Sequence, residues 1–211
     1  MAIRAVIFDM DGVLIDSEAA WDAAREAYAR ESGGTWTDSA QRDMMGMSST
    51  EWSRYMHEEL GVAAEPEQIS ADVVEKMLAQ YHERLPLIEG AVDAVKRAAD
   101  RYGTLGLASS ANRPLIDLAL RESGLDRYFQ ATVSSEEVER GKPAPDVYME
   151  AARRLGVDPA EAAAVEDSHN GILSAHNAGM HVIAIPNQAF PPGDDALAMA
   201  DHVLDSIADL R

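Results

Sequence analysis

Two carboxylates near the N-terminus, Asp9 and Asp11, follow a short apolar stretch and stand two residues apart. If residues 3–8 form a buried strand, its side chains alternate with a period of two, so both acids leave its end on the same side. Gly12 then lets the backbone turn sharply away. The carboxyl ends of strands are where open α/β sheets bind ligands. The position of this acid pair therefore predicts a chemical role.

Polar side chains follow later predicted strands in the same way. They comprise two hydroxyl groups, a lysine in a proline-rich segment and two further acids: Ser109, Ser110, Lys142, Glu166 and Asp167. If these groups share one sheet edge, four carboxylates converge, and two unit charges about 4 Å apart repel by about 4 kcal/mol at an effective dielectric near 20. Such a cluster calls for a cation, and oxygen ligands favour Mg²⁺. With a metal ion and a lysine, the site can hold a phosphoryl group while one aspartate acts as nucleophile.

The elements that must position these groups fall into two blocks. After the first strand, apolar residues keep helical spacing, which predicts helices at about 17–31, 37–45, 48–56 and 71–85. Ser17 is placed to cap the first of them. The next convincing strand begins only at residue 104, whereas a helix on a parallel sheet normally returns within a few tens of residues. We therefore expect residues 16–88 to form an all-helical cap domain inserted into a core of residues 1–15 and 89–211.

From residue 89 onward, helical and strand patterns alternate. Strands are predicted at about 104–108, 131–133, 162–165, 181–185 and 202–204, with helices between them. This alternation is typical of α/β proteins and predicts a Rossmann-like, doubly wound parallel sheet.

The composition excludes several classes of protein. Thirty-seven acidic against eighteen basic residues give a formal net charge of -19, which disfavours attraction to nucleic acid or anionic lipid. The absence of cysteine excludes disulfides and thiolate metal sites. No apolar run approaches the roughly 18 residues of a membrane helix, and the N-terminal run, cut by two acids, does not fit a signal peptide. We expect a cytoplasmic monomer that acts on a small phosphorylated molecule and binds neither nucleic acid nor membrane.

Four stretches in order resemble the motifs of the haloacid dehalogenase superfamily. They are Phe8-Asp9-Met10-Asp11-Gly12-Val13-Leu14-Ile15-Asp16-Ser17, Leu107-Ala108-Ser109-Ser110, Gly141-Lys142-Pro143 and Val165-Glu166-Asp167-Ser168. The resemblance covers essentially the whole chain. It is greatest to the branch of phosphosugar phosphatases and β-phosphoglucomutases, in which a helical cap follows the first strand. It implies a Mg²⁺-dependent phosphatase that hydrolyses a sugar or polyol phosphate.

This resemblance also implies a role for each matching residue. Asp9 would attack phosphorus and form an aspartyl phosphate, and Asp11 would protonate the leaving oxygen and then activate water. Ser109 and Ser110 would bind the transferred phosphoryl group, although Ser110 also fits a helix cap. Lys142 would neutralise the phosphoryl group and Asp9.

The implied metal site uses acids from two strand ends. Asp9, the backbone carbonyl of Asp11 and Asp167 would hold Mg²⁺. Glu166 would act either as a further ligand or as a support for the ligands.

The predicted cap departs from the mutase pattern at two positions. Trp21 stands where the mutases have a histidine, and Ser49, counted from Gly46, stands where they have an arginine for the distal phosphate. A bisphosphate intermediate needs a cation for its distal phosphate, and Ser49 does not supply one. These departures therefore favour hydrolysis. Trp21, Met47 and Ser49 are candidate substrate contacts, with packing in the cap core as the alternative for the apolar two.

Three other functions remain open at this point. A phosphosugar mutase of the β-phosphoglucomutase type is the nearest alternative. A receiver-like signalling domain also combines aspartates, a hydroxyl and a lysine at strand ends. In such a domain the phosphoacceptor aspartate follows a later strand, whereas this chain has Ser134 and Ser135 there and carries a helical insertion. A purely binding or structural role would leave the converging acids unexplained.

Overall fold

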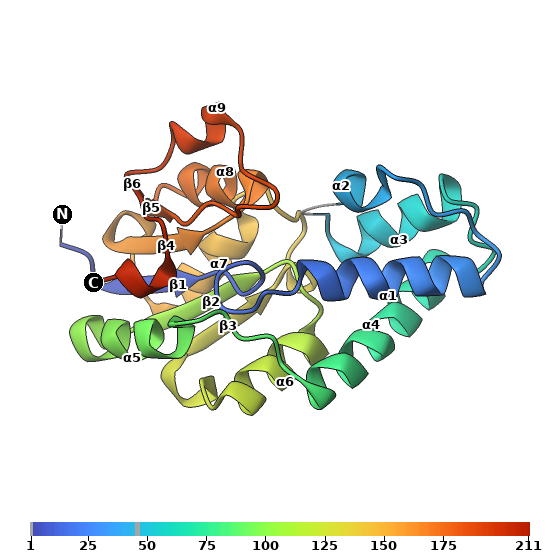
Figure 1. Cartoon of the computed structure of the whole chain (residues 1–211). Helices are drawn as coiled ribbons and strands as arrows, with labels where there is room; N and C mark the ends of the chain where they lie inside the picture. The colour runs from blue at the N-terminus through green and yellow to red at the C-terminus, as the bar shows by residue number, and fades with distance from the viewer. Residues whose placement is uncertain (1, 45–46) are drawn as a thin grey trace.

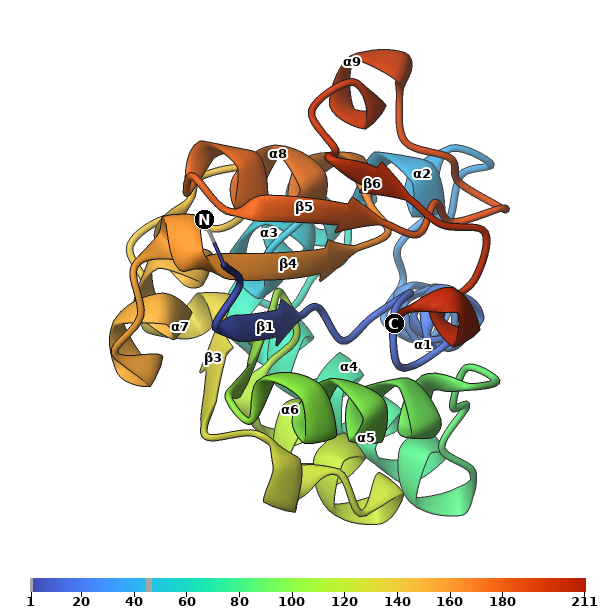
Figure 2. The same cartoon turned by 90° about the vertical axis from the view of Figure 1, so that its left-hand side faces the viewer.

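The computed structural model describes residues 2–44 and 47–211. One parallel sheet with the strand order β3-β2-β1-β4-β5-β6 forms its centre. The arrows of β1, β4, β5 and β6 point the same way in Figure 2. The strands are β1 (Ala5–Phe8), β2 (Leu105–Ser109), β3 (Ala131–Ser134), β4 (Ala162–Glu166), β5 (His181–Ala184) and β6 (His202–Val203). The predicted doubly wound parallel sheet is confirmed. The first strand lies in its middle, between β2 and β4.

Helices cover both faces of the sheet. They are α5 (Ala91–Tyr102), α6 (Arg113–Ser123), α7 (Asp146–Leu155), α8 (His169–Asn177) and the short α9 (Asp194–Leu197). Side chains of β1 alternate between the two faces: Val6 and Phe8 pack in the core that includes α5 and α6, whereas Ala5 and Ile7 pack in the core that includes α7 and α8. Burial on both faces explains why this strand is apolar throughout rather than alternating.

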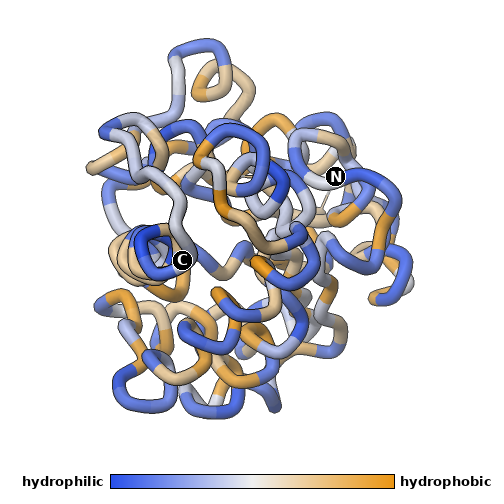
Figure 3. The backbone as a smooth tube through the Cα atoms, turned by 90° about the vertical axis from the view of Figure 1, so that its right-hand side faces the viewer, coloured by the Kyte–Doolittle hydropathy of each residue, from blue (hydrophilic) through white to orange (hydrophobic). Residues whose placement is uncertain are grey.

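Hydropathy follows the helical repeat. The tube alternates between blue and orange within helices (Figure 3), the pattern of helices that turn one face towards a core. Helix α5, for example, buries Ala91, Ala94, Val95 and Ala98. Within the described ranges, no helix combines the length and the apolar character needed to cross a membrane.

A block of helices separates β1 from α5 in the chain. Its members are α1 (Glu18–Glu31), α2 (Ala40–Met44), α3 (Ser49–Glu58) and α4 (Pro66–Glu83). Figure 1 shows them together beyond the carboxyl ends of the strands. Their shared core includes the fully buried Trp52, Met56, Met77 and Tyr81.

The predicted helix boundaries agree in part with those of the structure. The capping box of Ser48 and Glu51 is present at the start of α3. Helix α4 begins at Pro66, five residues before the predicted start, because proline is well suited to the first helical position. The expected end of the second helix, near Met45, lies outside the described residues.

Two short segments connect the helical block to the rest of the chain. They run side by side: the Asp16 amide donates to the Pro86 carbonyl at 2.8 Å, and the Ile88 amide donates to the Leu14 carbonyl at 3.0 Å. An isolated bridge between Ile15 and Leu87 lies between these bonds. The division into residues 1–15, 16–88 and 89–211 stays a prediction.

Candidate active site

The strand register brings the predicted site residues together. Phe8 at the end of β1 is level with Leu107 of β2 and Val165 of β4. Asp9 therefore lies beside the ends of two strands that contribute their own polar residues, Ser109 and Glu166. The central place of β1 is what allows one carboxylate to face both neighbours.

Gly12 makes the close approach of the first loop possible. Its φ is 75°, which favours glycine, and a Cβ atom there would lie 1.9 Å from Oδ2 of Asp167. No other residue fits this position without moving Asp167.

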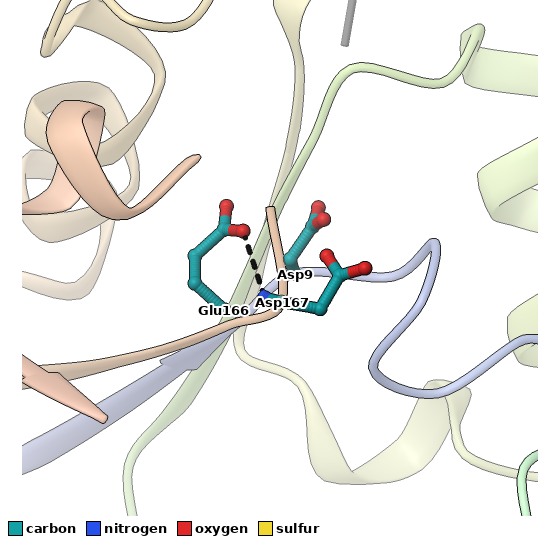
Figure 4. Close-up of side chains that lie close together, drawn as sticks. All are labelled: Asp9, Glu166 and Asp167. Carbon is teal, nitrogen blue, oxygen red and sulfur yellow. Dashed lines mark hydrogen bonds between the residues drawn. The ribbon is translucent and has the colours of Figure 1, made fainter. Parts of the chain in front are cut away.

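Three buried carboxylates form a cluster at this edge of the sheet. One oxygen each of Asp9, Glu166 and Asp167 lies within 4.8 Å of the others, and Figure 4 shows the three side chains rising from the same strand ends. Burial raises the pKa of Asp9 to about 8, and the nearby Glu166 and Asp11 add to this. Burial also raises the pKa of Asp167 well above its usual range. An all-oxygen donor set with this excess of negative charge fits Mg²⁺.

Lys142 is the cation that the structure places inside this cluster. Its Nζ lies 2.9 Å from Oδ1 of Asp9 and 2.6 Å from Oε1 of Glu166, and it donates to the Ala108 carbonyl at 3.2 Å. Burial lowers the pKa of Lys142, but the two carboxylates outweigh burial and hold that pKa above its usual range. One lysine is thus shared by two acids, which leaves Asp167 for a further cation.

Glu166 is held by hydrogen bonds on both oxygens. Its Oε1 accepts from Lys142 and, at 2.8 Å, from the Tyr148 hydroxyl. Its Oε2 accepts from the Asp167 amide at 3.1 Å and from the Ser168 hydroxyl at 3.2 Å. These contacts favour a supporting role over direct metal coordination. Sequence reasoning missed Tyr148, because nothing local connects a residue in α7 with the end of β4.

Asp11 points towards groups of the first helix and the second strand. The Ser17 hydroxyl donates to its Oδ1, and the Ser109 hydroxyl lies 3.5 Å from its Oδ2. Burial raises the pKa of Asp11, while hydrogen bonds from Ser17 and Trp21 oppose that rise. The prediction that the Ser17 side chain caps α1 is wrong: Ser17 occupies the N-cap position, but its hydroxyl makes no capping hydrogen bond and binds Asp11 instead.

The two serines at the end of β2 lie in different surroundings. Ser109 is fully buried, and its hydroxyl accepts a hydrogen bond from the Ala111 amide at 3.0 Å. Ser110 lines the cavity described next. A phosphoryl group in that cavity would meet Ser110 directly.

A cavity of about 570 Å³ lies between the strand ends and the helical block. Of the predicted site residues, those that line it are Asp9, Asp11, Trp21, Met47, Ser110, Lys142 and Asp167. Ser49 does not line it, and its hydroxyl donates instead to Oε1 of Glu136 at 3.1 Å. Gly46, from which Ser49 was counted, lies outside the described residues.

Arg25 is a cavity residue that sequence reasoning missed. Its side chain is buried, with Cζ 4.7 Å from the ring centroid of Trp21 and 5.0 Å from that of Trp52. Burial lowers the pKa of Arg25 to about 10, so it remains charged at neutral pH. The spacing of four residues from Trp21 puts both on one helix face, which was the available signal. Although Trp21 stands where the mutases have a histidine, Arg25 therefore supplies a cation at this wall of the cavity.

A family model described as haloacid dehalogenase-like hydrolase matches residues 6–185. Hexitol phosphatase B of Escherichia coli (strain K12) is 32% identical over 218 residues, covering 99% of this chain and 94% of the relative. A phosphorylated carbohydrates phosphatase of Thermotoga maritima is 32% identical over 181 residues, covering 86% and 84%. Among solved structures, the crystal structure of CbbY from Rhodobacter sphaeroides in complex with phosphate resembles this fold with a TM-score of 0.89. The two chains are 27% identical in sequence, and the match covers 99% of this chain and 96% of that one.

These similarities bear on the expectations drawn from the four motifs. They confirm the resemblance to the haloacid dehalogenase superfamily and to its phosphosugar phosphatase branch. They also confirm the predicted enzyme class, a phosphoric monoester hydrolase. The family match spans the acid pair, the buried lysine and the two acids at the end of β4. This chain belongs to the haloacid dehalogenase-like hydrolase family.

Proposed function

We propose that this protein is a Mg²⁺-dependent phosphatase that hydrolyses a sugar or polyol phosphate through an aspartyl-phosphate intermediate. The observation that carries the proposal is the position of Asp9: its carboxylate lies at the end of the central strand, 2.9 Å from Lys142 and beside a second acid that lines the same cavity. The activities for which the two phosphatase relatives are named support the substrate class.

In the first step, an oxygen of Asp9 forms a bond to phosphorus while the bond from phosphorus to the ester oxygen breaks. Asp11 gives its proton to the departing oxygen, so the alcohol leaves neutral. The raised pKa of Asp11, caused by burial, supports its protonated form at the start of this step. Ser110 and Lys142, which line the cavity, hold the phosphoryl oxygens. Ser109 is fully buried and is not among the residues lining the cavity, so its contact with the phosphoryl group stays a prediction.

In the second step, Asp11 is a carboxylate and accepts a proton from water as the water oxygen attacks phosphorus. The bond from phosphorus to Asp9 breaks, which releases inorganic phosphate and restores both acids to their starting forms. One residue thus serves as acid and then as base, and the intermediate remains on Asp9 between the steps.

Asp9, the Asp11 carbonyl and Asp167 would hold Mg²⁺, with Glu166 supporting them through its hydrogen bonds. When bound, the ion offsets the negative charge of the acids and of the phosphoryl group. The cavity wall formed by Trp21, Met47 and Arg25 would exclude water from the reacting groups and select the substrate.

A second candidate is a phosphosugar mutase. Arg25 favours it specifically, because a bisphosphate intermediate needs a cation on the helical side of the cavity and this residue lines that side. No contact of the described residues favours a receiver-like domain. The monomeric state stays a prediction.

The proposal is tested by measuring phosphate release from a panel of sugar and polyol phosphates with Mg²⁺ or EDTA, with analysis for isomerised products. We expect repeated release with Mg²⁺, loss with EDTA, and loss in Asp9→Asn. The matched control is Asp93→Asn, which changes an acid whose side chain is 74% exposed on α5. Full release by Asp9→Asn would refute the nucleophile assignment, and isomerisation without net release would favour the mutase.

A further inference from the structure

Arg25 is a buried charge without a protein partner. Its side chain belongs to α1, only 8% of the residue is exposed, and it lines the cavity that contains Asp9. Among the described residues, none accepts a hydrogen bond from its guanidinium or forms an ion pair with it, and its Nε is buried without a partner. Burying a charge in this way is costly unless something else satisfies it.

The surroundings of Arg25 leave only one part of its guanidinium available. Trp21 and Trp52 pack against it, with ring centroids 5.9 Å apart and Cζ within 5.0 Å of each ring. These contacts satisfy the faces of the cation but not its N–H groups. The unused N–H groups form a planar fork that matches the paired oxygens of a carboxylate or a phosphate.

Neighbouring acids do not replace such a partner. Glu18 and Asp11 line the same cavity and act on Arg25 electrostatically, as does Asp22. None of the three forms an ion pair with Arg25. Burial raises the pKa of Glu18 to about 6, so its carboxyl is largely ionised at neutral pH, but it acts on Arg25 only through space and accepts no hydrogen bond from it.

We propose that Arg25 binds a second anionic group of the substrate, a carboxylate or a second phosphate, while Asp9 receives the phosphoryl group. The preferred substrate is then a small phosphate ester that carries another negative charge, such as the phosphate of a sugar acid or a sugar bisphosphate. This inference rests on the proposed phosphatase function and sharpens its substrate class. Arg25 is thereby a specificity-determining residue.

Two matched pairs of phosphate esters test this role. The carboxylate pair is 3-phosphoglycerate and glycerol 3-phosphate, and the phosphate pair is fructose 1,6-bisphosphate and fructose 6-phosphate. For each compound, kcat and KM are measured with Mg²⁺ for the wild type, Arg25→Gln and the control Arg30→Gln. Arg30 lies on the same helix, is 65% exposed in its side chain and pairs with Glu26.

We expect the wild type to prefer the doubly anionic member of at least one pair, which identifies carboxylate or phosphate as the second group. Arg25→Gln should lower kcat/KM for that compound about 10- to 100-fold, mainly through KM, because a hydrogen-bonded charge is lost. For the singly anionic compound of the same pair, Arg25→Gln should change kcat/KM less than about threefold. Arg30→Gln should leave kcat/KM unchanged for both compounds. Equal losses on both members, or a wild-type preference for the singly anionic members, would overturn the proposal.

Binding of the same four compounds, measured by calorimetry, separates this inference from the proposed function. If the protein releases no phosphate from any of these compounds or from p-nitrophenyl phosphate, the proposed phosphatase function is wrong. The preference in binding between the members of each pair still decides the role of Arg25. Arg25→Lys covers the case in which Arg25→Gln fails to fold, since it keeps the charge but not the planar fork. Retained discrimination in that variant at the wild-type level would contradict recognition through the fork.

Discussion

The hydroxyl of Ser17, at the start of α1, donates a hydrogen bond to the carboxylate of Asp11, in the loop after β1. This bond joins the helical block directly to the proposed acid and base of the reaction. It also opposes the effect of burial on the Asp11 pKa. The N-cap residue of α1 therefore contacts one of the two acids to which we assign the chemistry.

Replacing Ser17 by alanine should change the pH profile. Without the hydroxyl, burial acts on Asp11 with less opposition, so the Asp11 pKa rises further. Because the first step needs protonated Asp11, the alkaline limb of kcat/KM should move to higher pH, and kcat should fall about tenfold as the carboxylate loses its orientation. Ser53→Ala, at another buried serine, is the control. An unchanged alkaline limb in Ser17→Ala would remove Ser17 from the mechanism.

Alanine at Gly12 should weaken metal binding. The added Cβ would lie 1.9 Å from Asp167 and must displace it, which we expect to lower Mg²⁺ affinity at least tenfold. Gly33→Ala is a matched control, because Gly33 has a φ of 78° and nothing lies within 4 Å of the added atom. Both variants should lose about 1 kcal/mol from the strained backbone. Thermal unfolding measured at increasing Mg²⁺ concentrations gives both the Mg²⁺ affinity and the stability of each variant. Equal Mg²⁺ affinities of the Gly12→Ala and Gly33→Ala variants would contradict the expectation.

Lys142→Met should destabilise the protein. It leaves Asp9 and Glu166 buried without their shared cation, which we expect to cost about 3 kcal/mol in the free energy of unfolding. Lys96→Met removes an exposed lysine 3.6 Å from Asp93 and should cost less than about 0.5 kcal/mol. Urea denaturation measures both. Stability equal to that of the wild type would mean that the buried ion pairs contribute no net stabilisation.

Glu18→Gln should stabilise the protein at neutral pH. Burial raises the pKa of Glu18 from 4.5 to about 6, so between these pH values the folded state binds more protons than the unfolded chain. Stability conferred by this group therefore falls as the pH rises through that interval. Glutamine removes the penalty, and after allowance for solvent screening we expect a gain of about 1 kcal/mol at pH 7 that shrinks towards pH 4.5. Urea denaturation at several pH values measures the gain, with Glu75→Gln, at an exposed position of α4, as control. A gain that is independent of pH would have another cause.

Much of the core could be predicted because its signals are local. The central strands β1, β2 and β4 are short apolar runs, and the acids and serines stand at the run ends, where period-two alternation and sheet parallelism bring them to one edge. The helical block was also recognisable from its spacing. Its boundaries were predicted less accurately, as the start of α4 at Pro66 shows.

The sequence by itself determined the acid pair at Asp9 and Asp11, the parallel sheet and the family, because these depend on patterns within short segments. Only the tertiary structure decided which polar atoms meet. It directed Ser17 to Asp11 rather than to its own helix, satisfied Glu166 through Tyr148, and left Arg25, which lines the cavity, with a buried Nε that has no protein partner. The reason is that these buried hydrogen bonds join residues of different elements, so the packing of the elements brings donor and acceptor together or leaves one without a partner.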